Sequence, residues 1–260
     1  MTKKQSKATK QANMQRASER AAAIRAEHER KERRSRALVV AASVIGVLIV
    51  VIAIAVGLQQ GGNGEGQTST PPDNAVDDYA LAIGDNDAPV TVTVYEDMMC
   101  PYCGLFEEVS SERLKEYAES GDVEVRYHVV SFLDRASEDR YSTRAANALA
   151  VVLDTAGAEV AVEFHDALFA NQPEEGGAGL SDEQMIDMAV EAGADEDAIT
   201  GPIADLKFEP WVEDATEAWS KAGYTGTPTV TVNDEKVDFT SAEDLLANTE
   251  KAIADALGEQ

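Results

Sequence analysis

The sequence predicts an α/β domain that is preceded by a single transmembrane helix. An uncharged apolar stretch lies near the N-terminus, at residues 37–58. A strand-helix-strand pattern begins at Pro89, and a second strand pattern begins at Pro228. Helical patterns fill the region between them, at about residues 138–222. We therefore expect a β-α-β half and a β-β-α half that are separated by an inserted all-α subdomain.

The apolar stretch has the properties of a membrane anchor. As a helix, its 22 residues, ALVVAASVIGVLIVVIAIAVGL, would be about 33 Å long, which matches a bilayer core. A cleaved signal peptide would have a shorter apolar core followed by a small-residue cleavage site, so a retained signal anchor fits better. Residues 1–36 contain twelve Lys and Arg against four Glu, and such basic flanks remain in the cytoplasm. We expect a basic cytoplasmic arm at 1–36, a single-pass anchor at 37–58 in the cell membrane, and an extracytoplasmic remainder.

The part of the chain beyond the anchor is strongly acidic. The whole chain has a net charge of −26, although its first 36 residues are basic. Such an acidic surface repels phosphates, which argues against nucleic-acid binding. Residues 59–78 are rich in Gly, Gln, Thr, Pro and Asp without apolar periodicity, which predicts a flexible linker. The folded domain is accordingly predicted at residues 79–260.

The first half of the domain follows a strand-helix-strand order. Residues 89–97, PVTVTVYED, have β-branched residues on both faces, which is typical of a central strand. The following residues have apolar positions at helical spacing until Gly121 ends the helix. A second strand is predicted at residues 123–132, VEVRYHVVSF. This order implies a right-handed crossover and parallel pairing of the two strands.

The second half returns to strands after the helical insertion. A strand is predicted at residues 228–232, followed by a turn and a short partner strand at 236–239. Ser241, with Asp244 three residues later, matches an N-terminal capping pattern for the last helix. We expect this helix to pack its apolar side against the sheet.

The chain contains only two cysteines, Cys100 and Cys103, in the sequence Cys-Pro-Tyr-Cys. A structural zinc site takes four Cys or His ligands, and the remaining histidines do not supply them at a suitable spacing. A purely structural disulfide is also disfavoured, because so short a loop gains little stability from closure. We therefore interpret the pair as redox-active and expect no metal in this site.

The position of the pair supports this interpretation. Cys100 lies where a central strand ends and a helix begins, so backbone N–H groups and the helix dipole favour its thiolate. Pro101 suits the first helical turn, where an N–H is not needed. We expect Cys100 to be the exposed attacking thiol and Cys103, one turn further along, to be the buried resolving thiol.

Three stretches resemble the thioredoxin superfamily, and within it the DsbA-like oxidoreductases with a helical insertion: APVTVTVYEDMMCPYC, FHDALFANQ and GYTGTPTVTVN. The resemblance covers about residues 79–260 and implies a thioredoxin-like fold. It also implies a cis peptide bond before Pro228, which would lie against the cysteine turn, and a backbone at Thr227 that pairs with extended substrate. An X-Pro bond suits this geometry, although a trans proline at the start of a strand is the alternative.

The sequence departs from the family pattern at one position. Thioredoxins have a buried carboxylate six residues before the first cysteine, where this chain has Val94. Glu96, Asp97 or water could then carry the proton, although both acids could instead be solvated residues at the strand end. Pro101 and Tyr102 between the cysteines also occur in glutaredoxins, so they leave the direction of electron flow open.

Other residues near the motif have two readings each. Met98 and Met99 could form an apolar patch that grips unfolded substrates, or they could pack in the core. His128 and His165 lie at no recognisable catalytic spacing, so we assign them structural or surface roles.

These features predict a protein disulfide oxidoreductase. A dithiol oxidase that acts on exported unfolded or reduced proteins is the favoured function. A reductase for cytochrome c maturation or thiol repair, and a non-catalytic thioredoxin-fold binding module, are the alternatives. We expect a monomer without a cofactor, since no NAD or flavin motif is visible. A membrane quinone-linked partner is expected to reoxidise it.

Overall fold

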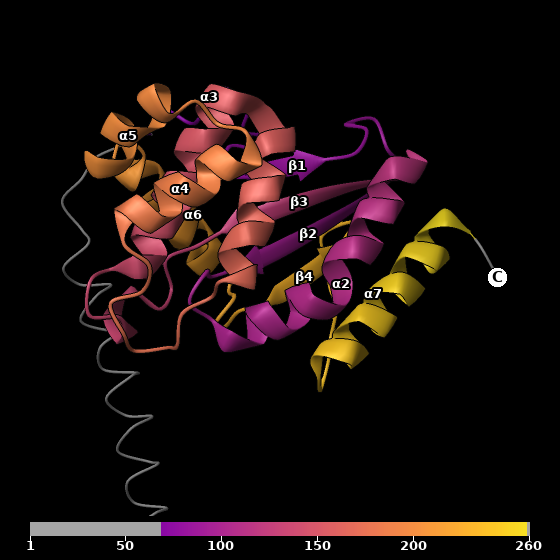
Figure 1. Ribbon diagram of the computed structural model, residues 1–260. Helices are drawn as coiled ribbons and strands as arrows, with labels where there is room; N and C mark the ends of the chain where they lie inside the picture. Colours follow the sequence, from indigo (N-terminus) through magenta and orange to yellow (C-terminus); the bar gives the residue numbers. More distant parts are fainter. Residues whose placement is uncertain (1–68, 259–260) are drawn as a thin grey trace, which may run out of the picture. The chain divides into compact units, whose positions relative to one another are not determined.

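The computed structural model describes residues 69–258. The predicted cytoplasmic arm, the transmembrane anchor and the first part of the linker lie outside these residues. The described chain forms a five-stranded sheet with the strand order β1-β3-β2-β4-β5 (Figure 1). The strands are β1 (Leu81–Ile83), β2 (Val90–Glu96), β3 (Val123–Val129), β4 (Thr229–Val232) and β5 (Glu235–Lys236).

Strand β2 is the centre of the sheet, as its two-sided apolar pattern predicts. It pairs in parallel with β3 and antiparallel with β4, so Val94 lies between Tyr127 and Val230. Successive side chains of a strand point to opposite faces, so Val94 and Glu96 share one face. Both are buried. The predicted parallel pair and the predicted strand at residues 228–232 are therefore confirmed.

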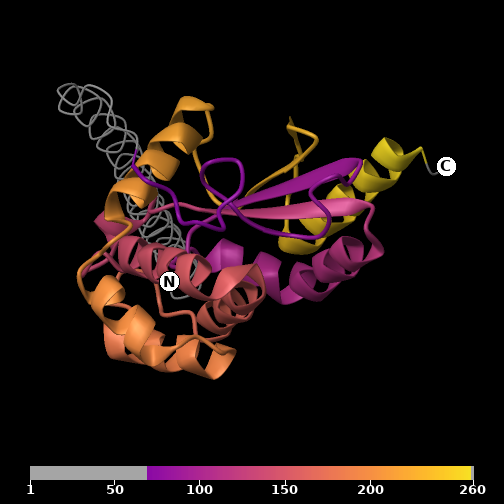
Figure 2. The same ribbon diagram turned by 90° about the horizontal axis from the view of Figure 1, so that it is seen from above.

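Two helices lie together on one face of the sheet. These are α2 (Pro101–Ser120) and α7 (Ala242–Leu257), and Figure 2 shows them below the sheet when it is seen edge-on. Gly121 ends α2 with φ 81°, a left-handed conformation that favours glycine. The Ser241 side chain accepts a hydrogen bond from the backbone N–H of Asp244, so the predicted cap of the last helix is confirmed.

The helical insertion joins the two halves of the domain. It comprises η1 (Asp134–Ala136), α3 (Tyr141–Ala170), α4 (Asp182–Ala192), α5 (Glu196–Ala204) and α6 (Glu209–Lys221). Helix α6 lies across the opposite side of the sheet from α2 (Figure 2). Helix α3 bends at Gly157, whose φ is 84°. Among the described residues, α3 alone is long and apolar enough to cross a membrane, but most of its apolar window is buried inside the domain, so it is a core helix.

The strand boundaries differ from the sequence prediction in three places. The edge strand β1 was not predicted, because three residues are too few to show alternation. Strand β3 ends at Val129, since the following residues turn away towards η1. Strand β5 covers residues 235–236 rather than 236–239. Its turn is made by Asn233 and Asp234, both with positive φ.

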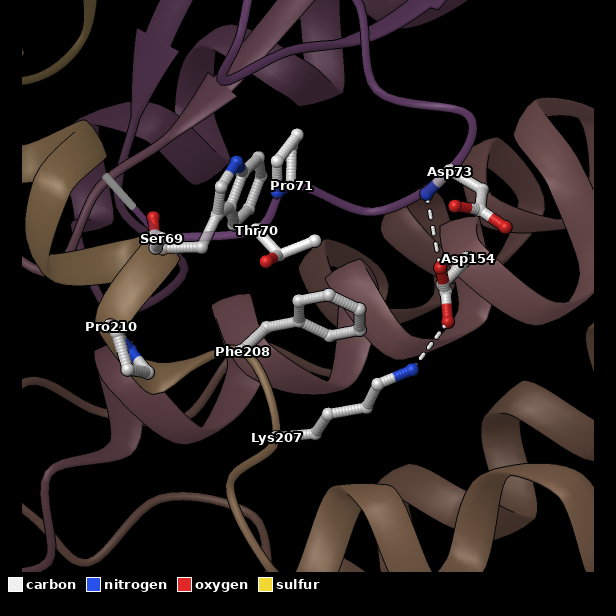
Figure 3. A pocket seen from close by; sticks show the side chains of 9 residues that line it. Ser69, Thr70, Pro71, Asp73, Asp154, Lys207, Phe208 and Pro210 are labelled. Atoms are coloured by element: carbon white, nitrogen blue, oxygen red, sulfur yellow. Dashed lines mark hydrogen bonds and ion pairs between the residues drawn. The ribbon is translucent and has the colours of Figure 1, made fainter. Parts of the chain in front are cut away.

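Residues 69–73 lie against the helical insertion and line a pocket of about 360 Å³ (Figure 3). The Asp154 carboxylate accepts the backbone N–H of Asp73 at 3.0 Å and pairs with Lys207 Nζ at 2.6 Å. The Ser69 hydroxyl donates to Asp214 at 2.7 Å. These contacts fasten the first described residues to α3 and α6. Neither cysteine lines this pocket.

Candidate active site

Cys100 and Cys103 lie at the N-terminus of α2, directly after the central strand. Cys100 is the residue that caps the helix, and Pro101 occupies its first turn. The backbone N–H groups of Cys103 and Gly104 both donate to the Cys100 carbonyl, at 3.0 and 3.1 Å. Both cysteines are free thiols. The sequence therefore placed the pair correctly at the strand-helix junction.

The loop before β4 covers the cysteine turn. The Thr227–Pro228 peptide bond is cis, as the family resemblance implied. The Cys100 thiol donates a hydrogen bond to the Thr227 carbonyl, with 3.3 Å between Sγ and O. Because this loop lies over it, Cys100 is only 5% exposed. The expectation that the first thiol is exposed is therefore wrong.

The surroundings of Cys100 favour its thiolate. The Cys103 thiol hydrogen bond contributes most to lowering the Cys100 pKa from 9.0 to about 6, against the opposing effect of burial. The Thr227 side chain and the backbone N–H groups of Cys103 and Tyr102 lower this pKa further. The Thr227 hydroxyl is buried without another partner, so it is free to donate to the charged sulfur.

The surroundings of Cys103 favour its neutral thiol. It is only 1% exposed, and burial raises the pKa of its thiol well above the ordinary value. The neighbouring charges of Cys100 and Glu96 raise it further. One thiol is thus poised to be charged at neutral pH while the other keeps its proton. This asymmetry is the one that a nucleophile and a resolving thiol require.

Fold and site agree with known proteins. The sequence matches the thioredoxin family over residues 77–251. The chain belongs to the thioredoxin family.

The matches within the thioredoxin family are to disulfide oxidoreductases. The reduced disulfide bond oxidoreductase DsbG from Mycobacterium tuberculosis superposes with a TM-score of 0.60 at 28% identity, over 73% of this chain and 90% of that one. Disulfide bond formation protein D of Bacillus subtilis is 25% identical over 66% of this chain and 76% of its own length. The predicted thioredoxin-like fold and DsbA-like enzyme class are confirmed.

A different kind of relative shares part of the sequence. Serine/threonine-protein kinase PknE of Mycobacterium tuberculosis is 31% identical over 122 residues. The match covers 45% of this chain but only 22% of the kinase. The shared part is therefore a minor portion of that protein.

Asp97 fastens the active-site loop of this thioredoxin-family domain. It is buried, and its carboxylate accepts hydrogen bonds from the backbone N–H groups of Met99 and Leu133 and from the Ser142 hydroxyl, at 2.7 to 2.9 Å. Burial raises the pKa of Asp97 to about 7, although these hydrogen bonds oppose the shift. Since Asp97 is buried, the reading of it as a solvated strand-end acid is wrong.

Glu96 is also buried, on the α2 side of the sheet. It lies two residues beyond Val94 on the same face of β2, so it approaches the position of the family's usual acid. His165 Nε2 lies 2.5 Å from Glu96 Oε1. The solvated reading of Glu96 is therefore wrong as well. The role of either acid in proton transfer stays a prediction.

The side chain of Gln172, two residues after the end of α3, supports the cysteine turn. Its amide donates to the carbonyls of Met98 and Cys100, at 3.1 and 2.9 Å. A Cβ added at Gly104 would lie 2.3 Å from the Gln172 side-chain oxygen, so a larger residue there would displace the Gln172 amide. Gln172 ends the FHDALFANQ stretch, which explains why that stretch accompanies the cysteine motif.

The two methionines do not form a substrate patch. Met98 and Met99 are both fully buried, so the core-packing alternative is the correct one. They follow β2 and turn inward because Asp97 holds the Met99 N–H. The exposed apolar side chains beside the cysteines are instead Tyr102 and Leu105, which are 69% and 50% exposed on the first turns of α2.

Sequence reasoning missed two buried residues near the site, Glu107 and His165. Burial, followed by the charge of Glu96, raises the pKa of Glu107 to about 8. The signal for Glu107 was its spacing, because it lies one helical turn after Cys103 on the buried face of α2. His165 carried no comparable signal, since its contact with Glu96 joins residues 69 positions apart. His128 packs between Tyr79 and Tyr95, in agreement with its predicted structural role.

Proposed function

We propose that this chain is an extracytoplasmic dithiol oxidase that forms disulfides in exported proteins through Cys100 and Cys103. The observation that carries the proposal is the stabilised Cys100 thiolate, which lies against the Thr227 backbone. A stabilised thiolate favours the reduced form of the enzyme, so the disulfide form gives up its oxidising equivalents readily.

The reaction follows from the asymmetry of the two thiols. A substrate thiolate attacks Cys100 Sγ of the enzyme disulfide, the Cys100–Cys103 bond breaks, and Cys103 leaves and takes up a proton. A second substrate thiolate then attacks the substrate sulfur of this mixed disulfide and releases the Cys100 thiolate. The substrate loses two electrons and the enzyme gains two. The lowered pKa of Cys100 makes it the better leaving group in the second step.

The neighbouring residues have complementary roles in this proposal. The Thr227 backbone pairs with an extended segment of substrate, and Pro228 keeps it against the cysteine turn. Tyr102 and Leu105 offer apolar contact area to an unfolded chain. Pro101 starts the helix without needing an N–H.

The proposed location rests on the N-terminal sequence. The basic residues 1–36 keep the N-terminus in the cytoplasm, and residues 37–58 cross the cell membrane once. Residues 59–78 then hold the monomeric domain close to chains emerging from the membrane. A quinone-linked membrane protein returns the enzyme to its disulfide form.

The proposal is tested by trapping substrates in the organism's own cells. Cys103→Ala removes the resolving thiol, so mixed disulfides on Cys100 should accumulate and disappear on reduction. Cys100→Ala is the matched control and should give none. Absence of adducts from the Cys103→Ala strain would contradict the oxidase and favour a non-catalytic binding module. A wild-type enzyme that is mostly dithiol in cells would instead indicate a reductase.

A further inference from the structure

A cluster of buried acids and one histidine lies beside the redox site. Glu96 comes from the end of β2, Glu107 from α2 and His165 from α3. One ring nitrogen of His165 and one carboxylate oxygen of each acid all lie within 4.8 Å of one another. All three residues are buried. Three elements that are far apart in the sequence thus direct metal-binding atoms to one point.

Most carboxylate oxygens of the cluster have no hydrogen-bond donor among the described residues. The Glu96 Oε2 atom and both carboxylate oxygens of Glu107 are buried and have no partner in the described part of the chain. Within the described residues, His165 Nε2 forms a hydrogen bond with Glu96 Oε1 and with no other atom. Leaving a buried acceptor unpaired costs about 1–3 kcal/mol, so native proteins satisfy such atoms with a partner, water or an ion.

We propose that Glu96, Glu107 and His165 bind one divalent transition-metal ion, of which Zn²⁺ fits best. One imidazole nitrogen and two carboxylate oxygens form a donor set that suits zinc, with a fourth position left for water. Binding would displace the proton of Glu107, and the two positive charges of the ion would then balance the two buried carboxylates. The ion replaces the hydrogen between His165 Nε2 and Glu96 Oε1, and these atoms separate to about 3.3 Å, as tetrahedral bonds of about 2.0–2.1 Å require. Rotation of the Glu96 carboxylate would have to supply this movement.

A second layer of residues orients the histidine. Its other ring nitrogen, Nδ1, faces Asp166 Oδ1 at 3.4 Å. Asp166 in turn forms an ion pair with Lys115. A carboxylate behind the histidine is the usual support of a histidine that binds zinc, because it fixes the ring orientation and the proton position. The Tyr127 ring packs against the imidazole, with 4.5 Å between the ring centres.

A route for the ion leads to the cluster from outside. A pocket of about 700 Å³ lies between α2 and the end of α3, and Glu107, Asp166, Gly104 and Phe169 are among its lining residues. Of the three proposed ligands, Glu107 lines this pocket, so an entering ion would meet its carboxyl group first. The proposed site uses neither cysteine and does not depend on the proposed oxidase function.

Zinc titration of the full chain tests the proposal. The chain is purified in a mild detergent with Cys100→Ser and Cys103→Ser, so that no thiol binds zinc, and it is stripped with a chelator. Calorimetry with Zn²⁺ should then give one site per chain, and zinc should raise the melting temperature. Ca²⁺ should not compete, because it requires six to eight oxygen ligands.

The variants locate the site. Glu107→Gln keeps the shape but loses a charged ligand, so the zinc affinity should fall at least about 10-fold. Glu108→Gln, at the exposed neighbouring residue, is the matched control and should bind as the parent does. If the parent binds no stoichiometric zinc, or if Glu107→Gln binds it unchanged, the proposal is overturned. X-ray absorption of the zinc-loaded parent gives an answer that does not depend on a variant. One imidazole with oxygen neighbours supports the site, and a shell without imidazole contradicts it.

Discussion

The charge state of Cys100 is the property that the structure predicts most directly. We consider two perturbations of the reduced protein. The first lowers the pH from 9 to 4.5, through the folded pKa of about 6. The second is Cys103→Ala, which removes the hydrogen bond that contributes most to lowering this pKa. Acidification should lower the fraction of Cys100 that is thiolate in the wild-type protein, and the variant should have a lower thiolate fraction at a given pH.

The expected magnitude follows from the shift of the pKa from 9.0 to about 6. At pH 7 a pKa of 6 gives roughly ten thiolates for each thiol, whereas a pKa of 9 gives roughly one thiolate per hundred thiols. Linkage converts this difference into about 1.4 kcal/mol of stability for the reduced fold at pH 7, rising to about 4 kcal/mol above pH 9. Because the folded pKa is the lower one, this stability is fully present above the unfolded pKa and is lost as the pH falls through 6. In redox terms, 1.4 kcal/mol corresponds to about 30 mV.

Two measurements check this prediction. Thiolate absorbance near 240 nm, taken as the difference between reduced and oxidised protein, should titrate with a midpoint at about pH 6. Cys103→Ala should raise the midpoint by about a unit or more, and Cys103→Ser, which keeps a hydroxyl donor, should raise it less. Denaturant unfolding of the reduced form should show the matching loss of stability on acidification. A midpoint near 9 in the wild-type protein would refute the reasoning.

Two further predictions concern the framework of the site. Gly179→Ala should destabilise the protein by about 2 kcal/mol or more in urea unfolding, because Gly179 has φ 73° and a Cβ would lie 2.3 Å from the Tyr141 ring. Gly201→Ala, in open space within α5, should instead stabilise by about 0.5–1 kcal/mol, and equal effects would contradict this account. Gln172→Ala should cost about 1–2 kcal/mol by loss of two hydrogen bonds to the cysteine turn, whereas Asn171→Ala, at an exposed neighbour, should cost less than about 1 kcal/mol. Similar losses in the two variants would show that Gln172 does not support the turn.

Local patterns account for the parts of the fold that the sequence predicted. The two-sided apolar strand β2, the glycine that ends α2 and the serine cap of α7 are each encoded by residues adjacent in the chain. The cysteine pair and Pro228 were recognised for the same reason, since each lies in a short motif. Strand β1 was missed because three residues carry no measurable periodicity.

The surroundings of the site could not be predicted, because they depend on contacts between distant segments. The pairing of Glu96 with His165 joins β2 to the helical insertion. The burial of Asp97 depends on Leu133 and Ser142, which reach it from beyond β3. A sequence pattern can show that an acid ends a strand, but it cannot show what later covers that acid. The solvated reading of these acids failed for this reason.

The central claim is that Cys100 and Cys103 form an oxidising pair, and the equilibrium potential of this pair tests it most directly. The protein is equilibrated with mixtures of reduced and oxidised glutathione, and the dithiol fraction is measured after alkylation of the free thiols. The stabilised Cys100 thiolate contributes about 30 mV at pH 7, and the oxidase predicts a total potential well above that of thioredoxin, towards the about −120 mV of strong oxidants. A potential near that of thioredoxin, about −270 mV, would contradict the oxidase.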